Sequence, residues 1–229
     1  TGTFRNTEER QKYQPLILEK NGIRVAILNY TYGTNGIPVP SPTVVNLIDK
    51  DNILSDIEQA KKGYVDKIIV FMHWGLEYQH NPSDEQQELY QFCIENGADI
   101  VIGSHPHVIQ RMENNEDGFI AYSLGNFVSN QRKQFTDGGT ILHLELSKTN
   151  NHTWVSDANY QLTWVYTPLE KGRKEFYILP AAEYETREDF FMGMQDFEAL
   201  NLFLSDSRKL FNTQNVGVPE MTTTNEKQK

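Results

Sequence analysis

The sequence has a single cysteine and no long apolar run. One cysteine cannot form an internal disulfide, so cysteine usage does not identify the compartment. Cys93 falls on the apolar face of an expected helix, where a small buried hydrophobic residue is the ordinary interpretation. No apolar stretch approaches the roughly 20 residues that a membrane-spanning helix needs, so we expect no such helix in this sequence.

Positive charge is also scarce. The 21 Lys and Arg are outnumbered by 31 Asp and Glu, which gives a formal net charge of −10, and no basic stripe is visible. We therefore expect no nucleic-acid partner, because such binding depends largely on Lys and Arg at phosphates. An acidic surface would also repel a polyanionic polymer unless a local patch or a metal ion intervened.

What is present indicates a folded domain. The 229 residues include 12 Phe, 11 Tyr and 3 Trp, which excludes a wholly disordered chain, and the length suits one sizeable core. The sequence begins Thr1-Gly2-Thr3 without Met, from which we expect that the natural protein starts further upstream.

The order of predicted elements indicates an α/β first half and a more antiparallel second half. Apolar and β-branched runs predict strands at 23–30, 67–72, 99–102, 108–112, 119–124, 140–146 and 160–166. Helical spacing predicts helices at 51–62, 83–96 and 187–211, the last with a possible break. The helix at 83–96 has the clearest signature, because Ser83 and Gln86 form a capping-box pattern and Gly97 follows its end.

Three segments are expected along the chain. Residues 1–180 form the main domain, 181–215 a helical segment that packs on it, and 216–229 a polar, disordered tail. The first 20 residues are polar and give no clear secondary-structure signal.

Polar motifs directly follow the predicted apolar strands. They occupy residues 29–36, 73–78, 103–107 and 123–127. In α/β sheets, ligands bind outside the carboxyl ends of the strands, and parallel neighbours bring these loops to one rim. The sequence therefore predicts a site where these motifs meet.

The histidines in these motifs suggest a metal site. Pro106 fixes its own φ and favours an extended His105, so the rings of His105 and His107 would point to the same side. His73 follows another strand and could supply a third nitrogen. Imidazole suits several divalent ions, and Glu77 is a possible fourth ligand or a carboxylate that orients an imidazole.

Each residue also has a plainer interpretation. A single histidine at a strand end is more often structural, and a lone His-Pro-His is more often a loop feature. Asn126 could orient a ligand, but an asparagine beside Gly125 is also ordinary turn chemistry. His80, His143 and His152 lack a comparable context, and we interpret them as surface or strand residues.

Three motifs, in this order, resemble the CapA family of poly-γ-glutamate capsule biosynthesis, in the calcineurin-like metallophosphatase superfamily. They are His73-Trp74-Gly75-Leu76-Glu77-Tyr78, the segment from Gly97 to Val108 that contains Gly103-Ser104-His105-Pro106-His107, and Ala121-Tyr122-Ser123-Leu124-Gly125-Asn126-Phe127. The resemblance implies a layered α/β/β/α fold with mixed sheets. It implies that His73, His105 and His107 hold a divalent metal (Mn, Fe, Zn or Mg). His73, Glu77, His107 and Asn126 are the candidate catalytic residues.

The resemblance also implies a role outside the cytoplasmic membrane, with attachment through a segment that this sequence does not contain. Poly-γ-glutamate or a phosphoester would be the substrate, and other capsule-synthesis proteins would be partners. The superfamily's early Asp-x-His, Gly-Asp and Gly-Asn-His/Asp motifs are absent upstream of Ile23. We therefore expect the fold to lack its N-terminal part, so that a two-metal clamp would miss its bridging carboxylate.

Three hypotheses follow. The chain belongs to a metal-dependent phosphoester hydrolase, or to a non-catalytic binding or scaffold component of the polymer machinery with a vestigial site. In the third, it is an inert truncated domain whose exposed strand edges favour dimerisation or domain swapping.

Overall fold

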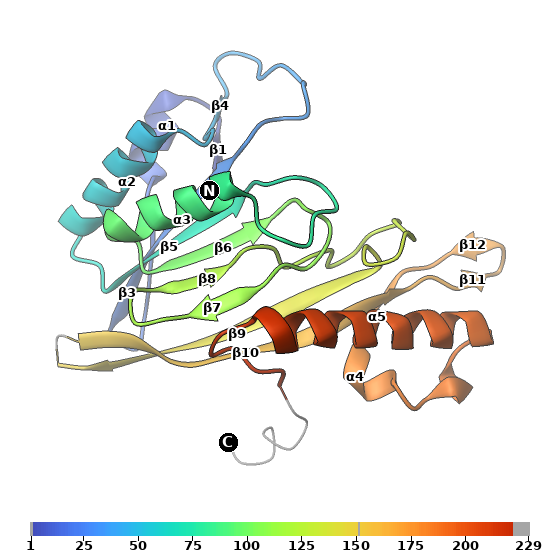
Figure 1. Ribbon diagram of the computed structural model, residues 1–229. Helices are drawn as coiled ribbons and strands as arrows, with labels where there is room; N and C mark the ends of the chain where they lie inside the picture. Colours follow the sequence, from blue (N-terminus) through green and yellow to red (C-terminus); the bar gives the residue numbers. More distant parts are fainter. Residues whose placement is uncertain (1, 151, 222–229) are drawn as a thin grey trace.

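The computed structural model describes residues 2–150 and 152–221, which form a layered α/β fold with two main sheets (Figure 1). The larger sheet has six strands. In spatial order they are β2 (Leu16–Lys20), β3 (Ile23–Thr31), β5 (Lys67–His73), β6 (Ile100–Ser104), β8 (Phe119–Ala121) and β7 (Met112–Asn114). The four inner strands are parallel, and β2 and β7 run antiparallel at the two edges.

The second sheet is antiparallel and has three strands. It consists of β13 (Tyr177–Pro180), β10 (His152–Tyr166) and β9 (Gly138–Thr149), and the β9–β10 pair forms a long hairpin. Two small antiparallel pairs lie outside these sheets. They are β1 (Thr3–Phe4) with β4 (Val44–Val45), and β11 (Leu169–Glu170) with β12 (Arg173–Lys174).

Two helices cover one face of the six-stranded sheet. They are α2 (Lys50–Lys62), which ends at Gly63, and α3 (Asp84–Glu95), whose capping box joins Ser83 and Gln86 as expected. Their apolar faces pack on alternate residues of β3 and β5, so one face of each strand is in this core. Cys93 is fully buried there, and burial raises the pKa of its thiol to about 12, which agrees with its interpretation as a small hydrophobic residue.

The other face of the six-stranded sheet packs on the β9–β10 hairpin and on α5. The C-terminal helical region contains α4 (Ala181–Tyr184), the 3₁₀ turn Glu188–Phe190 and α5 (Met194–Gln214). Apolar side chains of β10 and α5 share one core with residues of β6 and β8. Within it, the ring centroids of Tyr160 and Phe211 are 4.5 Å apart. The expected layered α/β/β/α class is therefore confirmed, with one mixed sheet and one antiparallel sheet.

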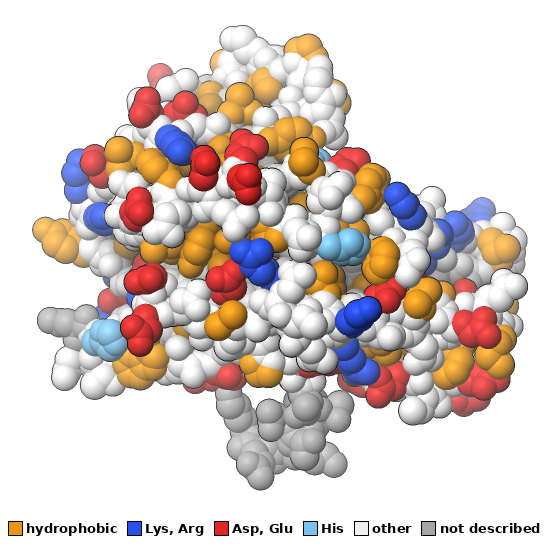
Figure 2. Space-filling view, in the orientation of Figure 1, with side chains coloured by type: hydrophobic (Ala, Val, Ile, Leu, Met, Phe, Trp, Pro, Cys, Tyr) orange, Lys and Arg blue, Asp and Glu red, His pale blue; other side chains and the backbone are white. Residues whose placement is uncertain are grey.

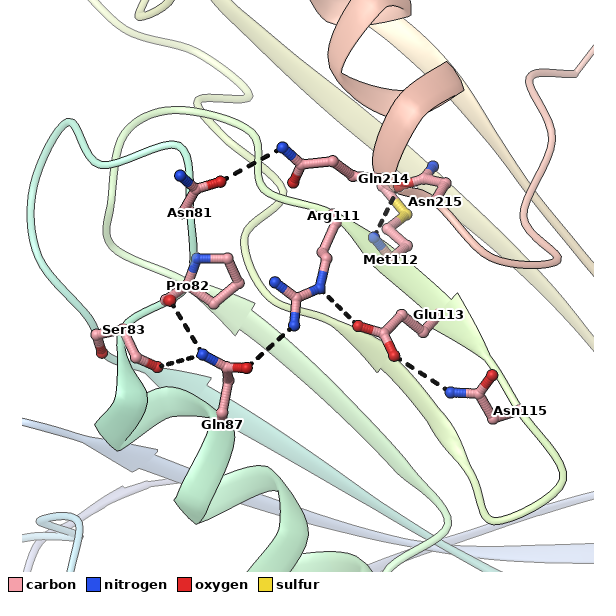
Figure 3. Close-up of polar contacts among 10 residues, drawn as sticks. All are labelled: Asn81, Pro82, Ser83, Gln87, Arg111, Met112, Glu113, Asn115, Gln214 and Asn215. Carbon is pink, nitrogen blue, oxygen red and sulfur yellow. Dashed lines mark hydrogen bonds and ion pairs between the residues drawn. The ribbon is translucent and has the colours of Figure 1, made fainter.

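The C-terminal end of α5 is hydrogen-bonded to the edge strand β7 and to the loop before α3 (Figure 3). The backbone N–H of Met112 donates to Oδ1 of Asn215, and Nε2 of Gln214 donates to Oδ1 of Asn81. Nearby, Arg111 links the side chains of Gln87 on α3 and Glu113 on β7.

The prediction of a disordered tail from residue 216 is wrong over residues 216–221, the part of it that the structure describes. Val216 bridges Glu113 of β7, Glu220 bridges Tyr160 of β10, and Val218 is buried. Backbone pairing and burial of Val218 hold this segment in place. Residues 222–229, the rest of that expectation, lie outside the described residues.

The strand expected at 108–112 is also wrong over most of its length. Only Met112 belongs to β7, and residues 106–108 form bends. A single bridge joins Ile109 to Leu124, and the hydroxyl of Ser123 donates to the carbonyl oxygen of Val108. Backbone pairing with residues 122–123 continues without forming a regular strand, because the N–H of Gln110 donates to Ser123 at 3.0 Å and that of Tyr122 donates to Arg111 at 3.1 Å.

The N-terminal segment without a clear signal in the sequence is structured. It contains β1, the helix α1 (Thr7–Tyr13) and β2. Asn6 caps α1 by accepting from the backbone N–H of Glu9 at 2.8 Å. Asp56 on α2 accepts from Arg10 at 2.7 Å and from the buried Gln14 at 2.9 Å, which ties this segment to the core.

The face drawn in Figure 2 carries Lys and Arg scattered among Asp and Glu, with no continuous basic stripe among its described residues. Within the described part of the chain, no helix is both long enough and apolar enough to cross a membrane.

Candidate functional site

The candidate site lies at the carboxyl ends of the parallel strands β3, β5 and β6. The backbone N–H of Tyr32 donates to the carbonyl oxygen of His73 at 2.9 Å, and that of Trp74 donates to Ser104 at 3.0 Å. These bonds bring the loops after the three strands to one rim. The predicted convergence of three of the motifs is therefore observed.

The three predicted histidines lie side by side. Ring centroids are 4.7 Å apart for His73 and His105, and 6.1 Å apart for His105 and His107. Glu77, His105 and His107 each place one ligand atom within 4.8 Å of the other two. Among the described residues, this group does not include His73, whose Nδ1 lies 3.3 Å from Oγ of Ser104. A ligand role for His73 stays a prediction.

The backbone around Pro106 differs from the expectation. His105 and His107 have φ angles of 105° and 60°, so His105 is not extended, and the predicted reason for the convergence of the two rings is wrong. The chain bends after β6, and the N–H of Tyr78 donates to the carbonyl oxygen of Pro106 at 2.8 Å. Positive φ at a non-glycine residue costs on the order of 1–3 kcal/mol and persists where the surroundings enforce it, often at functional sites.

The electrostatics of the site favour neutral imidazoles. Partial burial lowers the pKa of His73, and the neighbouring His105 and His107 lower it further. Burial also lowers the pKa of His105, although Glu77 opposes this shift. Neutral rings carry a free nitrogen lone pair, which is the form that binds metals.

The remaining predicted residues both contact His107. Oε1 of Glu77 lies 3.7 Å from Nε2 of His107, and Oδ1 of Asn126 lies 2.9 Å from Nδ1. Asn126 is thus more than a turn residue, because its side chain is bonded to a histidine of the site. The ring of Tyr78 stacks near the same imidazole with centroids 6.0 Å apart.

One aromatic residue of the site was not singled out from the sequence. The Tyr32 ring lies 4.4 Å from His105 and stacks on His73 at 5.7 Å. Its place directly after the first predicted strand was the available signal. Trp74, which follows His73 in the sequence, is buried at 1% exposure and belongs to the core.

A cavity of about 460 Å³ adjoins the histidines. Its lining includes Tyr32, Glu77, Glu85 and His105. Nζ of Lys133 lies 4.7 Å from the centroid of the Tyr78 ring. The site therefore has an acidic cavity and a cation close by.

A comparison with known protein families assigns the chain to one of them. The family described as "Bacterial capsule synthesis protein PGA_cap" matches residues 1–131, more than half of the sequence. The chain belongs to the PGA_cap family. The match contains the segments of His73, Glu77, His105, His107 and Asn126, so the candidate site lies within the family domain.

Two curated relatives support the assignment. The chain is 40% identical over 131 residues to a capsule biosynthesis protein CapA of Bacillus anthracis, covering 55% of this chain and 32% of the relative. It is 35% identical over 130 residues to a PGA biosynthesis protein CapA of Bacillus subtilis, covering 56% and 34%. The matched part thus spans about a third of the length of these relatives.

Solved structures show weaker similarity. A calcineurin-like phosphoesterase YfkN from Bacillus subtilis aligns with a TM-score of 0.42 and 17% identity, over 70% of this chain and 54% of that one. The sulfate thiohydrolase SoxB from "Termus thermophilus" aligns with a TM-score of 0.41 and 12% identity, over 84% and 29%.

The donor atoms of the PGA_cap chain fit a divalent ion closely but not fully. In a tetrahedral site with ligands about 2.1 Å from the ion, neighbouring donor atoms are about 3.4 Å apart. The donor atoms of this group lie within 4.8 Å of one another, and Nε2 of His107 is 3.7 Å from Oε1 of Glu77. Glu77 is exposed, and rotation of its side chain can close such a difference. Two imidazoles and a carboxylate also match a common set of metal ligands.

Proposed function

We propose that this chain carries the metal-binding part of a CapA-like protein that acts in capsule polymer synthesis or export outside the cytoplasmic membrane. Membership of the PGA_cap family and the names of the two CapA relatives support the biological role. The observation that carries the chemical proposal is the group of Glu77, His105 and His107. Poly-γ-glutamate or a phosphoester is the proposed substrate, and other capsule-synthesis proteins are the proposed partners.

The proposed ligands are His105, His107 and Glu77, with His73 beside them. Two nitrogen donors favour Zn, Mn or Fe over Mg, which prefers oxygen ligands. Bound there, a divalent ion supplies Lewis-acid polarisation of a phosphoryl or carbonyl oxygen. His73, whose pKa is lowered by partial burial and by the neighbouring histidines, lies beside these ligands as a candidate proton acceptor for a reacting group.

Ion binding can be measured directly. In equilibrium dialysis with Zn²⁺ or Mn²⁺ followed by elemental analysis, we expect the wild-type protein to bind an ion. We expect the double variant His105→Ala/His107→Ala to bind it more than about 100-fold more weakly, since even loss of residues that only support ligands costs 10- to 100-fold. The matched control is His143→Ala/His152→Ala, which removes two exposed histidines of the β9–β10 hairpin. If His105→Ala/His107→Ala bound the ion as tightly as His143→Ala/His152→Ala, the metal site would be refuted.

Turnover and biological role need a full-length version, because the match covers about a third of the relatives. We expect a generic phosphodiester such as bis-p-nitrophenyl phosphate to be hydrolysed with added Mn²⁺. We also expect polymer production to be lost in the stable His105→Ala/His107→Ala variant. Normal production in that variant would favour the scaffold role over the catalytic one.

A further inference from the structure

The side chain of Asn126 is fixed in one orientation. Its Nδ2 donates to the backbone carbonyl oxygen of Thr136 at 2.8 Å and to Oε1 of Gln131 at 3.2 Å. A backbone carbonyl can only accept a hydrogen bond, so the amide nitrogen must face Thr136. The amide oxygen therefore faces Nδ1 of His107, at 2.9 Å.

This orientation determines where the proton of His107 lies. An amide oxygen can only accept, so the hydrogen between Asn126 and His107 belongs to Nδ1 of the imidazole. The other ring nitrogen, Nε2, is 3.7 Å from Oε1 of Glu77, which is too long for a hydrogen bond. In a neutral ring, Nε2 then carries the free lone pair on the side of Glu77.

We infer that Asn126, clamped by Thr136, is a positioning residue that holds His107 in the Nδ1–H tautomer and leaves Nε2 free to bind a ligand. The value of this tautomer for ion binding rests on the proposed function. The tautomer itself is a property of the chain and can be measured without any ion.

The clamp involves the part of the chain beyond residue 131, where the family match ends. Gln134 donates to Asp206 of α5 at 2.8 Å, and the indole N–H of Trp164 on β10 donates to Asp137 at 2.8 Å. These two contacts flank Thr136, whose own backbone N–H and hydroxyl donate to the carbonyl oxygen of Lys133 at 3.0 and 2.7 Å. The C-terminal hairpin and α5 thereby support a residue of the site.

The test is a long-range ¹H–¹⁵N correlation spectrum of the chelator-treated protein in mildly alkaline buffer. Signals of His107 are assigned by their absence in His107→Ala. We expect a protonated Nδ1 and an unprotonated Nε2 in the wild type, and averaged signals of both tautomers in Asn126→Ala. Asn130→Ala is the matched control, because Asn130 is an exposed residue of the same loop that accepts from Lys174, and it should keep the wild-type pattern.

A wild-type spectrum with the proton on Nε2, or on both nitrogens, would overturn the inference, and this outcome does not depend on how any Asn126 variant folds. A second readout is Zn²⁺ affinity, expected to fall about 10- to 100-fold in Asn126→Ala relative to Asn130→Ala. Equal affinities would refute the positioning role. If the wild type binds no ion, the proposed function fails, and the spectrum still decides the tautomer.

Discussion

Replacement of Gly103 by alanine is expected to destabilise the protein by at least about 3 kcal/mol, at the upper end of the usual cost of overpacking a core. A Cβ at this position would lie 2.0 Å from the carbonyl oxygen of Tyr122 and 2.4 Å from Nε1 of Trp74. These two atoms are joined by a hydrogen bond of 3.0 Å that fills the space beside Gly103.

Neither neighbour of Gly103 can move aside cheaply. Gly103 of β6 pairs with Met72 of β5, and on its other side its carbonyl oxygen accepts from the backbone N–H of Leu124 at 3.2 Å, so the surrounding backbone is hydrogen-bonded. The indole of Trp74 is almost fully buried. Since His105 follows two residues later, the variant should also disturb the candidate site.

Urea unfolding of Gly103→Ala measures this effect. The matched control is Gly33→Ala, because no heavy atom lies within 4 Å of a Cβ added at Gly33. The control should stay within about 0.5 kcal/mol of the wild type, as surface substitutions usually do. A similarly small change in Gly103→Ala would contradict the packing described for β6.

The second large effect is expected for Asp56→Ala, which should cost about 3–5 kcal/mol, the usual result of removing one partner of a buried ion pair. Asp56 is buried at 2% exposure and accepts from Arg10, Gln14 and the hydroxyl of Tyr30 at 2.7 to 2.9 Å. Its loss leaves a cation and two buried polar groups without their acceptor. Burial and this carboxylate together raise the pKa of Tyr30, so the phenol stays protonated.

Chemical denaturation of Asp56→Ala and of Glu58→Ala separates this network from a general effect of charge. Glu58 is an exposed carboxylate on the same helix, and its removal should change the free energy of unfolding by less than about 0.5 kcal/mol. Hydrogen exchange should also show faster opening of α1 in Asp56→Ala, because Arg10 belongs to that helix. Equal stability of the two variants would refute a structural role for Asp56.

Sequence patterns predicted the elements whose signals are local. The apolar runs of β3, β5 and β6 and the capping box of α3 depend on neighbouring residues, and they were placed correctly to within one or two residues. The helix α1 was missed because it is stabilised by a contact that is remote in sequence. Its Arg10 donates to Asp56, which lies 46 positions further along the chain. Such contacts leave no periodic pattern in the sequence.

The site was predictable in position but not in detail. Placement of His73 and His105 after parallel strands was enough to predict that they meet. The positive φ of His105 was not predictable, because it is set by backbone bonds between loops and not by Pro106 alone. The clamp on Asn126 was also invisible, because its decisive acceptor is the main-chain carbonyl of Thr136.

The most direct test of the metal site is anomalous diffraction from crystals soaked in Zn²⁺. The account predicts an anomalous peak with the ion about 2.0–2.2 Å from a nitrogen of His105, a nitrogen of His107 and a carboxylate oxygen of Glu77. A map with no peak among these side chains, or with ions bound only elsewhere, would contradict it.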